Sequence, residues 1–223
     1  MRVYKFLSAK WALRDITEHR IKLSEFKDMN DPFELSGSRW SDPQVDSVLT
    51  DYTSATVGAL CFSTNWSNPL LWSHYAEKHS GICLGLDIDA QRGEVQTPIY
   101  VDGPEMQEPA VLFEALRTRD FGAAEGPIMR KLLLKFKGWL YEDEVRMFAR
   151  LDGKNGVPSY FDVGKKLVLR QVIAGVRCTV SRKRIDECVR RGGHSTPVEI
   201  LKARLSFDSF QVVEDPKGFA DNA

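Results

Sequence analysis

The stretch WLYEDEVRMFARL, from Trp139 to Leu151, carries the clearest pattern in this chain of 223 residues. In a strand, successive side chains point to opposite faces. Read this way, the stretch puts four apolar side chains on one face: Val145, Met147, Ala149 and Leu151. Glu142, Glu144 and Arg146 then lie side by side on the other face. A helix with Tyr141, Val145 and Phe148 on one stripe is the alternative, and the run from 145 to 151 favours the strand.

The two carboxylates, Glu142 and Glu144, would repel each other on a shared face. The pKa of one should therefore rise unless a cation or a substrate lies between them. Such a pair is a common way to build a general base or an acceptor that polarises a hydroxyl. The other interpretation is a solvated strand face on which Arg146 neutralises one of the two glutamates.

Composition limits the class of protein. The chain has 31 Lys and Arg and 31 Asp and Glu, so its overall charge gives no signal for nucleic acid or a membrane surface. No apolar run approaches the roughly 18 residues of a membrane span, and the first residues lack the apolar core of a signal peptide. We expect a cytoplasmic protein with no membrane partner. It should form one α+β domain over residues 1–215, followed by a flexible tail over 216–223.

The four cysteines are scattered without CxxC spacing: Cys61, Cys83, Cys178 and Cys188. This pattern is typical of reduced, buried thiols in a cytosolic protein. A zinc site needs His and Cys in tighter clusters, so we expect no metal.

Short strands and helices alternate along the chain. Strands are expected over 2–6, 20–24, 57–63, 82–88, 98–101 and 167–180, with a final hairpin from 198–207 and 210–213. Helices are expected over 9–18, 42–52, 70–79, 108–119, 127–137 and 181–191. Strands outnumber βαβ units, and several connections are short. This predicts an α+β fold with a mixed, mostly antiparallel sheet and flanking helices, and it excludes a doubly wound parallel sheet.

The helix over 70–79 has the best-defined ends. Asn68 suits the N-cap, Pro69 suits the first position, and Gly81 can close the C-terminus. His74 and His79 are five residues apart, which places them roughly 140° apart on a helix, so they should not share a metal.

Two further segments are candidates for ligand contacts. The loop Asn30-Asp31-Pro32-Phe33-Glu34 is either a rigid turn or a clamp whose amides are preset for a ligand. Ser63-Thr64 ends an apolar strand, where small hydroxyls either contact a ligand or bond to the chain that enters the next helix.

The segment from Lys165 to Arg204 is strongly basic, with eleven Lys or Arg against three Asp or Glu. In a neutral protein this excess polarises the surface, which could follow a phosphate backbone. Solvated helix and strand faces would give the same pattern.

Several motifs together resemble a bacterial family with a domain of unknown function that occurs among defence and toxin genes. In order along residues 1–180 they are Tyr4-Lys5-Phe6, Asn30 to Glu34, Cys61-Phe62-Ser63, Trp72 to Ala76 with His79, Gly81 and Cys83, and Trp139, Tyr141-Glu142, Glu144 and Arg146.

The layout is also similar to the ADP-ribosyltransferase fold, which implies a split sheet. Glu142-Asp143-Glu144 resembles the Glu-x-Glu element of that superfamily, and Phe62-Ser63-Thr64 resembles its serine element. Asn30-Asp31 is similar to the cofactor-binding loop of its nucleic-acid-modifying toxins. The chain departs from the pattern in two places. The first strand has Arg2, Tyr4 and Lys5 where an Arg or His is expected, and Asn65 stands where a second Ser is expected.

This resemblance implies cleavage of the nicotinamide bond of NAD and transfer of ADP-ribose to an acceptor. The bond breaks through a cation-like ribosyl transition state, as in glycoside cleavage. Glu144 would stabilise that charge and hold a ribose hydroxyl. Glu142 would orient or deprotonate the acceptor. Ser63 would support Glu144 or the nicotinamide ribose.

The resemblance also implies binding residues and partners. The expected contacts of the dinucleotide are Tyr4, Lys5, Asn30, Asp31, His74 and Tyr75. A nucleic-acid acceptor would meet Arg182, Lys183 and Arg184, and an antitoxin or another defence protein is an expected partner. One alternative is a nuclease-like toxin that uses His74, His79 and the basic C-terminal third. The other is a non-catalytic binding module in which Glu142, Glu144 and Arg146 form a surface ion-pair ladder.

Overall fold

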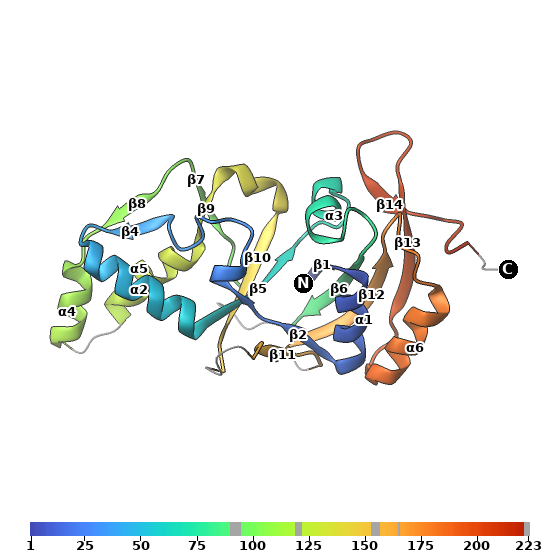
Figure 1. Cartoon of the computed structure of the whole chain (residues 1–223), viewed down its shortest axis with the longest axis horizontal. Coiled ribbons are helices and arrows are strands. Elements are labelled where there is room, and N and C mark those ends of the chain that lie inside the picture. Colours follow the sequence, from blue (N-terminus) through green and yellow to red (C-terminus); the bar gives the residue numbers. More distant parts are fainter. Residues whose placement is uncertain (90–94, 119–121, 153–156, 165, 221–223) are drawn as a thin grey trace.

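The protein has an α+β fold built on one large, mostly antiparallel sheet (Figure 1). The computed structural model describes residues 1–89, 95–118, 122–152, 157–164 and 166–220. Seven strands follow the order β10-β5-β1-β6-β12-β13-β14, and β3 adds to β5. These eight strands are β1 (Arg2–Leu7), β3 (Ser24–Glu25), β5 (Val57–Ser63), β6 (Ile82–Ile88), β10 (Glu144–Arg150), β12 (Leu167–Ala174), β13 (Glu199–Leu205) and β14 (Val212–Glu214). Only β12 and β13 pair in parallel within this sheet as described.

The other elements described are helices and three two-stranded sheets. The small sheets pair β2 (Arg20–Lys22) with β11 (Tyr160–Asp162), β4 (Ser38–Trp40) with β8 (Glu105–Gln107), and β7 (Ile99–Val101) with β9 (Leu134–Phe136). The helices are α1 (Ala9–Glu18), α2 (Pro43–Thr56), α3 (Pro69–Tyr75), α4 (Ala110–Thr118), α5 (Gly122–Leu133) and α6 (Arg182–Gly192), with 3-10 turns η1 (Phe26–Asp28) and η2 (Lys137–Glu142).

The main sheet opens between β1 and β5. β10 pairs with β5 over seven residues, and β1 pairs with β6 over six. Between β1 and β5, by contrast, the described residues pair only at Tyr4 and Ser63. Beyond that pair, the Lys5 side chain spans the gap and Nζ donates a hydrogen bond to the Cys61 carbonyl oxygen at 3.3 Å. The sheet is therefore two halves that meet at one residue pair.

The two faces of the sheet carry different layers. On one face, α1 and α6 bury Ile16 and Ile185 in the main core with Val3, Phe62 and Val145 of the strands. Strand alternation puts the neighbours of those strand residues on the other face. There α3 buries Trp72 against Phe6, and residues 26–35 pack with α5 over β5. In Figure 1, α2, α4 and α5 lie at one end of the molecule and α6 lies at the other.

Several predicted elements are confirmed. The helix over 9–18 has Ser8 as its N-cap, which accepts a hydrogen bond from Trp11 N, and it ends at a left-handed His19. The strands over 57–63 and 82–88 have the expected bounds. Ser181 caps α6, and Gly193 ends it with a φ of 63°.

The helix predicted over 70–79 is too long. Asn68 caps it and Pro69 begins it as expected, but α3 ends at Tyr75. Glu77, Lys78 and His79 all have positive φ, which an α-helix cannot contain. Gly81 has a different function from the expected helix end. A Cβ there would lie 2.2 Å from the Leu7 carbonyl oxygen, so glycine permits close contact with β1.

The segment between 127 and 146 also differs from the prediction. The helix expected over 127–137 ends at Leu133, and the chain then enters β9 and η2. The strand expected from Trp139 begins only at Glu144, because Asp143 is left-handed with a φ of 45°. Glu142 therefore lies in η2 and not on the strand.

Near its end, the chain still contacts the domain. Phe219, in the predicted tail, packs against the main core, and Gly218 N donates to Asp215 O at 2.9 Å. Residues 221–223 of that tail lie outside the described residues, as do Arg119 of the predicted helix over 108–119 and Lys165 of the basic segment. In the described part of the chain, no helix has the length and apolar character needed to cross a membrane.

Candidate active site

A pocket of about 310 Å³ lies where β1 and β5 separate. β1, β5, α3, η2 and the start of β10 all supply walls, together with the loop after η1. Eight residues predicted for catalysis or cofactor binding line it: Tyr4, Lys5, Asn30, Asp31, Ser63, Tyr75, Glu142 and Glu144. His74 is the exception. The structure thus brings together residues that are up to 140 positions apart in the sequence.

Five charged side chains form a buried group beside the pocket, and four of them line it. We call this group the charge cluster, and its members are Glu34, Lys135, Glu142, Glu144 and Arg146. Lys135 Nζ donates to Glu142 Oε2 at 2.5 Å and to Glu144 Oε2 at 2.6 Å. Lys135 is therefore the cation that the two carboxylates require. The interpretation of a solvated or surface ion-pair ladder is wrong, because the members that it names are at most 5% exposed.

Glu144 is held from two sides. Arg146 Nε and Nη2 donate to its two carboxylate oxygens at 2.8 and 3.1 Å, and Lys135 donates from the other side. Burial alone would raise the pKa of Glu144, but Arg146 and Lys135 outweigh burial and lower it to about 2. Glu144 is therefore ionised at neutral pH. Burial likewise opposes the charge on Lys135, but Glu144 and Glu142 raise its pKa above the ordinary lysine value.

Glu142 connects the charge cluster to α3. Tyr75 Oη donates a short hydrogen bond of 2.5 Å to Glu142 Oε1. Burial and the charge of Glu142 raise the pKa of Tyr75, while a side-chain hydrogen bond with Asn30 acts in the opposite direction. The Tyr75 hydroxyl is consequently a neutral donor that fixes Glu142 at the pocket wall.

Sequence reasoning assigned no site function to Glu34 or Lys135, and it named Arg146 only as a neutralising neighbour of the glutamates. Glu34 lies in the Asn30–Glu34 motif, and its carboxylate accepts from Arg146 Nη2 at 2.7 Å and from Nη1 at 3.0 Å. The position of Glu34 in that motif could have identified it as a site residue. Lys135 had no comparable signal, because it falls in a segment with Lys131 and Lys137 that was expected to be helical.

Ser63 and Asp31 line the pocket and also hold local turns. Ser63 Oγ donates to the Asn65 carbonyl oxygen at 2.9 Å and accepts from Asn65 N at 3.0 Å. Asp31 Oδ1 accepts from Phe33 N at 2.9 Å. The turn interpretation is therefore confirmed for both segments, and their contact with a ligand stays a prediction.

Four aromatic rings form a series that includes two pocket-lining residues, Trp139 and Tyr75. Lys135 Nζ lies 5.5 Å from the centre of the Trp139 ring. The Tyr141 ring lies 6.0 Å from Trp139 and 6.3 Å from His74, which in turn lies 6.1 Å from Tyr75. His74 is thus the outer member of this series and reaches the pocket only through its neighbours.

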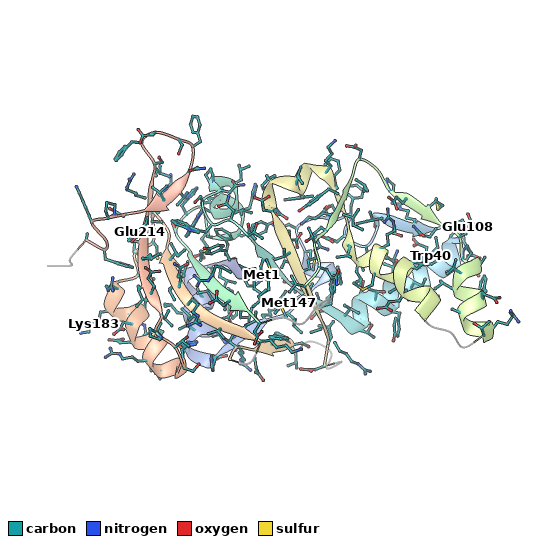
Figure 2. The ribbon with its side chains drawn as sticks, turned by 180° about the vertical axis from the view of Figure 1, so that it is seen from behind. Met1, Trp40, Glu108, Met147, Lys183 and Glu214 are labelled. Carbon is teal, nitrogen blue, oxygen red and sulfur yellow. The ribbon has the colours of Figure 1, made fainter. Side chains whose placement is uncertain are left out.

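The basic triplet is not at the pocket. Arg182, Lys183 and Arg184 begin α6, which packs on the opposite face of the sheet. Figure 2 shows Lys183 near one end of the molecule, with Trp40 and Glu108 at the other end and Met147 between them. Arg182 donates to the Ile200 carbonyl oxygen at 3.1 Å, and Arg184 pairs with Glu187 at 3.2 Å. The triplet therefore lies away from Glu144, and its contact with a nucleic-acid acceptor stays a prediction.

The structure does not join the two histidines of the nuclease alternative. The partly buried His79 ring stacks on Trp72 with centres 6.5 Å apart, whereas His74 is exposed, and neither lines the pocket. Within the described ranges, no group of His, Cys, Asp and Glu side chains is arranged to hold a metal ion.

Comparisons with family models, with curated proteins and with solved structures found no match to this chain. The resemblances drawn from the motifs accordingly stay predictions.

Proposed function

We propose that the pocket binds NAD and that the protein transfers ADP-ribose from NAD to a macromolecular acceptor. The observation that carries this proposal is the convergence of Glu144, Ser63 and Asn30. They come from three separate segments, and all line one pocket at the opening of the sheet. The resemblance to ADP-ribosyltransferases predicts this arrangement.

The charge of the site supports ribosyl transfer. Three carboxylates against two cations leave the charge cluster with one formal negative charge, and Glu144 is fixed and ionised within it. Loss of nicotinamide leaves positive charge on the ribose in the transition state. A preorganised negative charge stabilises that state more than the ground state, without reorganisation during the reaction. We assign this function to Glu144.

Glu142 is assigned to the acceptor. It lines the pocket and is fixed by Tyr75 Oη on one oxygen and by Lys135 Nζ on the other. A carboxylate fixed in this way can orient an acceptor group and take its proton as the new bond to ribose forms.

Other pocket residues suit the rest of the dinucleotide. Lys5 and Lys22 line the pocket and can bind the two phosphates of NAD. The Trp139 ring offers a flat surface for the nicotinamide ring. Ser63, fixed by its turn, can bond to the nicotinamide ribose. The basic triplet on α6 is not part of this proposal.

The proposed setting is a bacterial defence or toxin effector, in line with the motif resemblance, with an antitoxin as a regulatory partner. In this setting the acceptor is RNA, DNA or protein. Nuclease activity in the absence of NAD would instead support the nuclease alternative.

A thermal-shift titration with NAD, joined to an assay for released nicotinamide, tests the proposal. A ligand that binds only the native state raises the midpoint as its concentration exceeds the dissociation constant. NADH is the matched control, because its reduced ring is uncharged and is a poor leaving group. We expect a shift with NAD and nicotinamide release only from NAD. An unchanged midpoint at millimolar NAD would contradict the proposal.

A further inference from the structure

Residues 26–35 form one wall of the pocket, and we call them the wall loop. The loop supplies five residues to the lining: Asp28, Met29, Asn30, Asp31 and Glu34. Backbone hydrogen bonds within it are local, such as Met29 N to Phe26 O at 3.2 Å and Glu34 N to Asp31 O at 3.2 Å. Phe26 and Leu35 anchor its two ends in a hydrophobic cluster. The polar part between these anchors therefore depends on side-chain contacts for its position.

The principal contact of this kind joins Glu34 to Arg146, 112 residues away. Two guanidinium nitrogens meet the two carboxylate oxygens at 2.7 and 3.0 Å. The side chains are 5% and 0% exposed, so solvent does not screen the pair. Arg146 also donates to the Leu132 carbonyl oxygen at 3.0 Å, which fixes the plane of its guanidinium group.

The same guanidinium group holds Glu144. Nη2 is shared between Glu34 Oε1 and Glu144 Oε2, and Nε donates to Glu144 Oε1. The donors of arginine lie in a rigid plane, so the positions of its two carboxylate partners depend on each other. A displacement of Glu34 is therefore transmitted to Glu144 through Arg146.

We infer that Glu34 and Arg146 are positioning residues that couple the wall loop to Glu144. They set the distance between the loop, with its Asn30, and the carboxylate on β10. The expected effect of these two residues on catalysis rests on the proposed function. Their expected effect on the wall loop rests on the contacts alone.

A purely structural ion pair would give a different result, and the chain offers a matched control. Asp46 of α2 pairs with the buried Lys131 of α5 at 2.9 Å, and neither residue lines the pocket. Asp46→Asn and Glu34→Gln each remove one carboxylate charge from a buried cation. Only the second change should affect ligand binding.

Steady-state NAD hydrolysis tests the inference at a temperature at which every variant is folded. We expect Glu34→Gln to raise KM for NAD by about tenfold, since a lost charge-assisted bond loosens the wall loop. Glu34→Asp keeps the charge and should restore part of the loss. Asp46→Asn should leave KM unchanged. An unchanged KM in Glu34→Gln, or an equal rise in Asp46→Asn, overturns the inference.

Hydrogen exchange gives a second readout that needs no ligand. Backbone amides of residues 26–35 should exchange faster in Glu34→Gln than in wild type and in Asp46→Asn, because opening of the loop then requires less free energy. If wild type neither binds nor cleaves NAD, the proposed function fails while this measurement still tests the coupling. Equal exchange in the wall loop of all three proteins overturns it.

Discussion

Tyr4 and Ser63 face each other at the point where the two halves of the main sheet meet. On its other side Ser63 pairs with Glu144, so the three residues form a row across β1, β5 and β10 on one face of the sheet. The pocket begins at this row because the backbones of β1 and β5 separate beyond it. The position of Glu144 beside the opening thus follows from strand register, whereas the orientation of its carboxylate depends on its bonds to Lys135 and Arg146.

Glu144→Gln should lower stability as well as any activity. The amide keeps the shape but leaves Lys135 and Arg146 with less compensating charge in a buried site. Removing one partner of a buried ion pair commonly costs about 3–5 kcal/mol. Urea unfolding measures the change. The control is Glu199→Gln, an exposed carboxylate that accepts a hydrogen bond from the Gln171 amide, and it should change stability little. A loss no larger than the control's would show that the charge of Glu144 contributes nothing to folding.

Lys135→Met should destabilise the protein most at neutral pH. Without the ammonium group, Glu142 and Glu144 repel each other, and the folded-state pKa of one carboxyl rises above its unfolded value near 4.3. A raised carboxyl pKa makes the folded state bind protons more readily than the unfolded state. The loss of unfolding free energy in Lys135→Met is therefore complete above that pKa and shrinks as pH falls. Unfolding free energies at pH 7.5 and pH 5 measure this dependence.

The matched control for Lys135→Met is Lys137→Met. Lys137 is 58% exposed and lies 3.4 Å from Asp102, so its loss should cost less than about 1 kcal/mol at either pH. If the Lys135→Met deficit does not shrink at pH 5, the repulsion between the two glutamates is not its cause.

Asp15 on α1 should make stability fall as pH rises. Burial raises its pKa to about 7, although Lys5 partly offsets that effect. An unfolded aspartate titrates near 3.9, so between about pH 4 and 7 the folded state holds a proton that the unfolded state has lost. The free-energy cost of buried Asp15 to folding therefore grows across this window and is constant above it. Asp15→Asn should remove the penalty and gain on the order of 1–4 kcal/mol above pH 7.

Urea unfolding of wild type and Asp15→Asn from pH 4.5 to 8 measures the difference between the two curves. Asp208→Asn, at an exposed position of the β13–β14 loop, should give a curve parallel to that of wild type. Parallel curves for Asp15→Asn would show that Asp15 does not titrate in this window.

The two strands over 57–63 and 82–88 were predictable because burial on both faces selects apolar residues at nearly every position. The runs over 57–63 and 82–88 are almost continuously apolar, and both became central strands. The need for a cation between Glu142 and Glu144 was predictable from Coulomb repulsion. The identity of that cation was not predictable. Lys135 reaches the site because β9 pairs with β7, whose paired residues lie 35 positions earlier in the chain. No local pattern encodes that contact.

The end of α3 shows the same limit. Local rules favoured a helix as far as His79, with Gly81 at its end. The chain instead turns early because Gly81 packs against the Leu7 carbonyl oxygen of β1, and Arg177 N donates to His79 O at 2.9 Å. Long-range contacts with two other segments thus decide where this helix stops. The early stop places Tyr75 at the end of the helix, where its hydroxyl bonds to Glu142.

Changing Arg182, Lys183 and Arg184 together to Ala should leave NAD cleavage unchanged, within about twofold. The triplet lies on the α6 face of the sheet, where Arg182 bonds to Ile200 and Arg184 to Glu187, and none of the three lines the pocket. Stability should also be kept, because three cations in the first turn of a helix oppose its macrodipole, and alanine favours helix. The N-cap survives, since Ser181 Oγ accepts from the backbone N of residue 184. Nicotinamide release and the thermal midpoint measure both effects. A large loss of release in the triple variant would place the acceptor or the cofactor on α6 and contradict the site at the sheet opening.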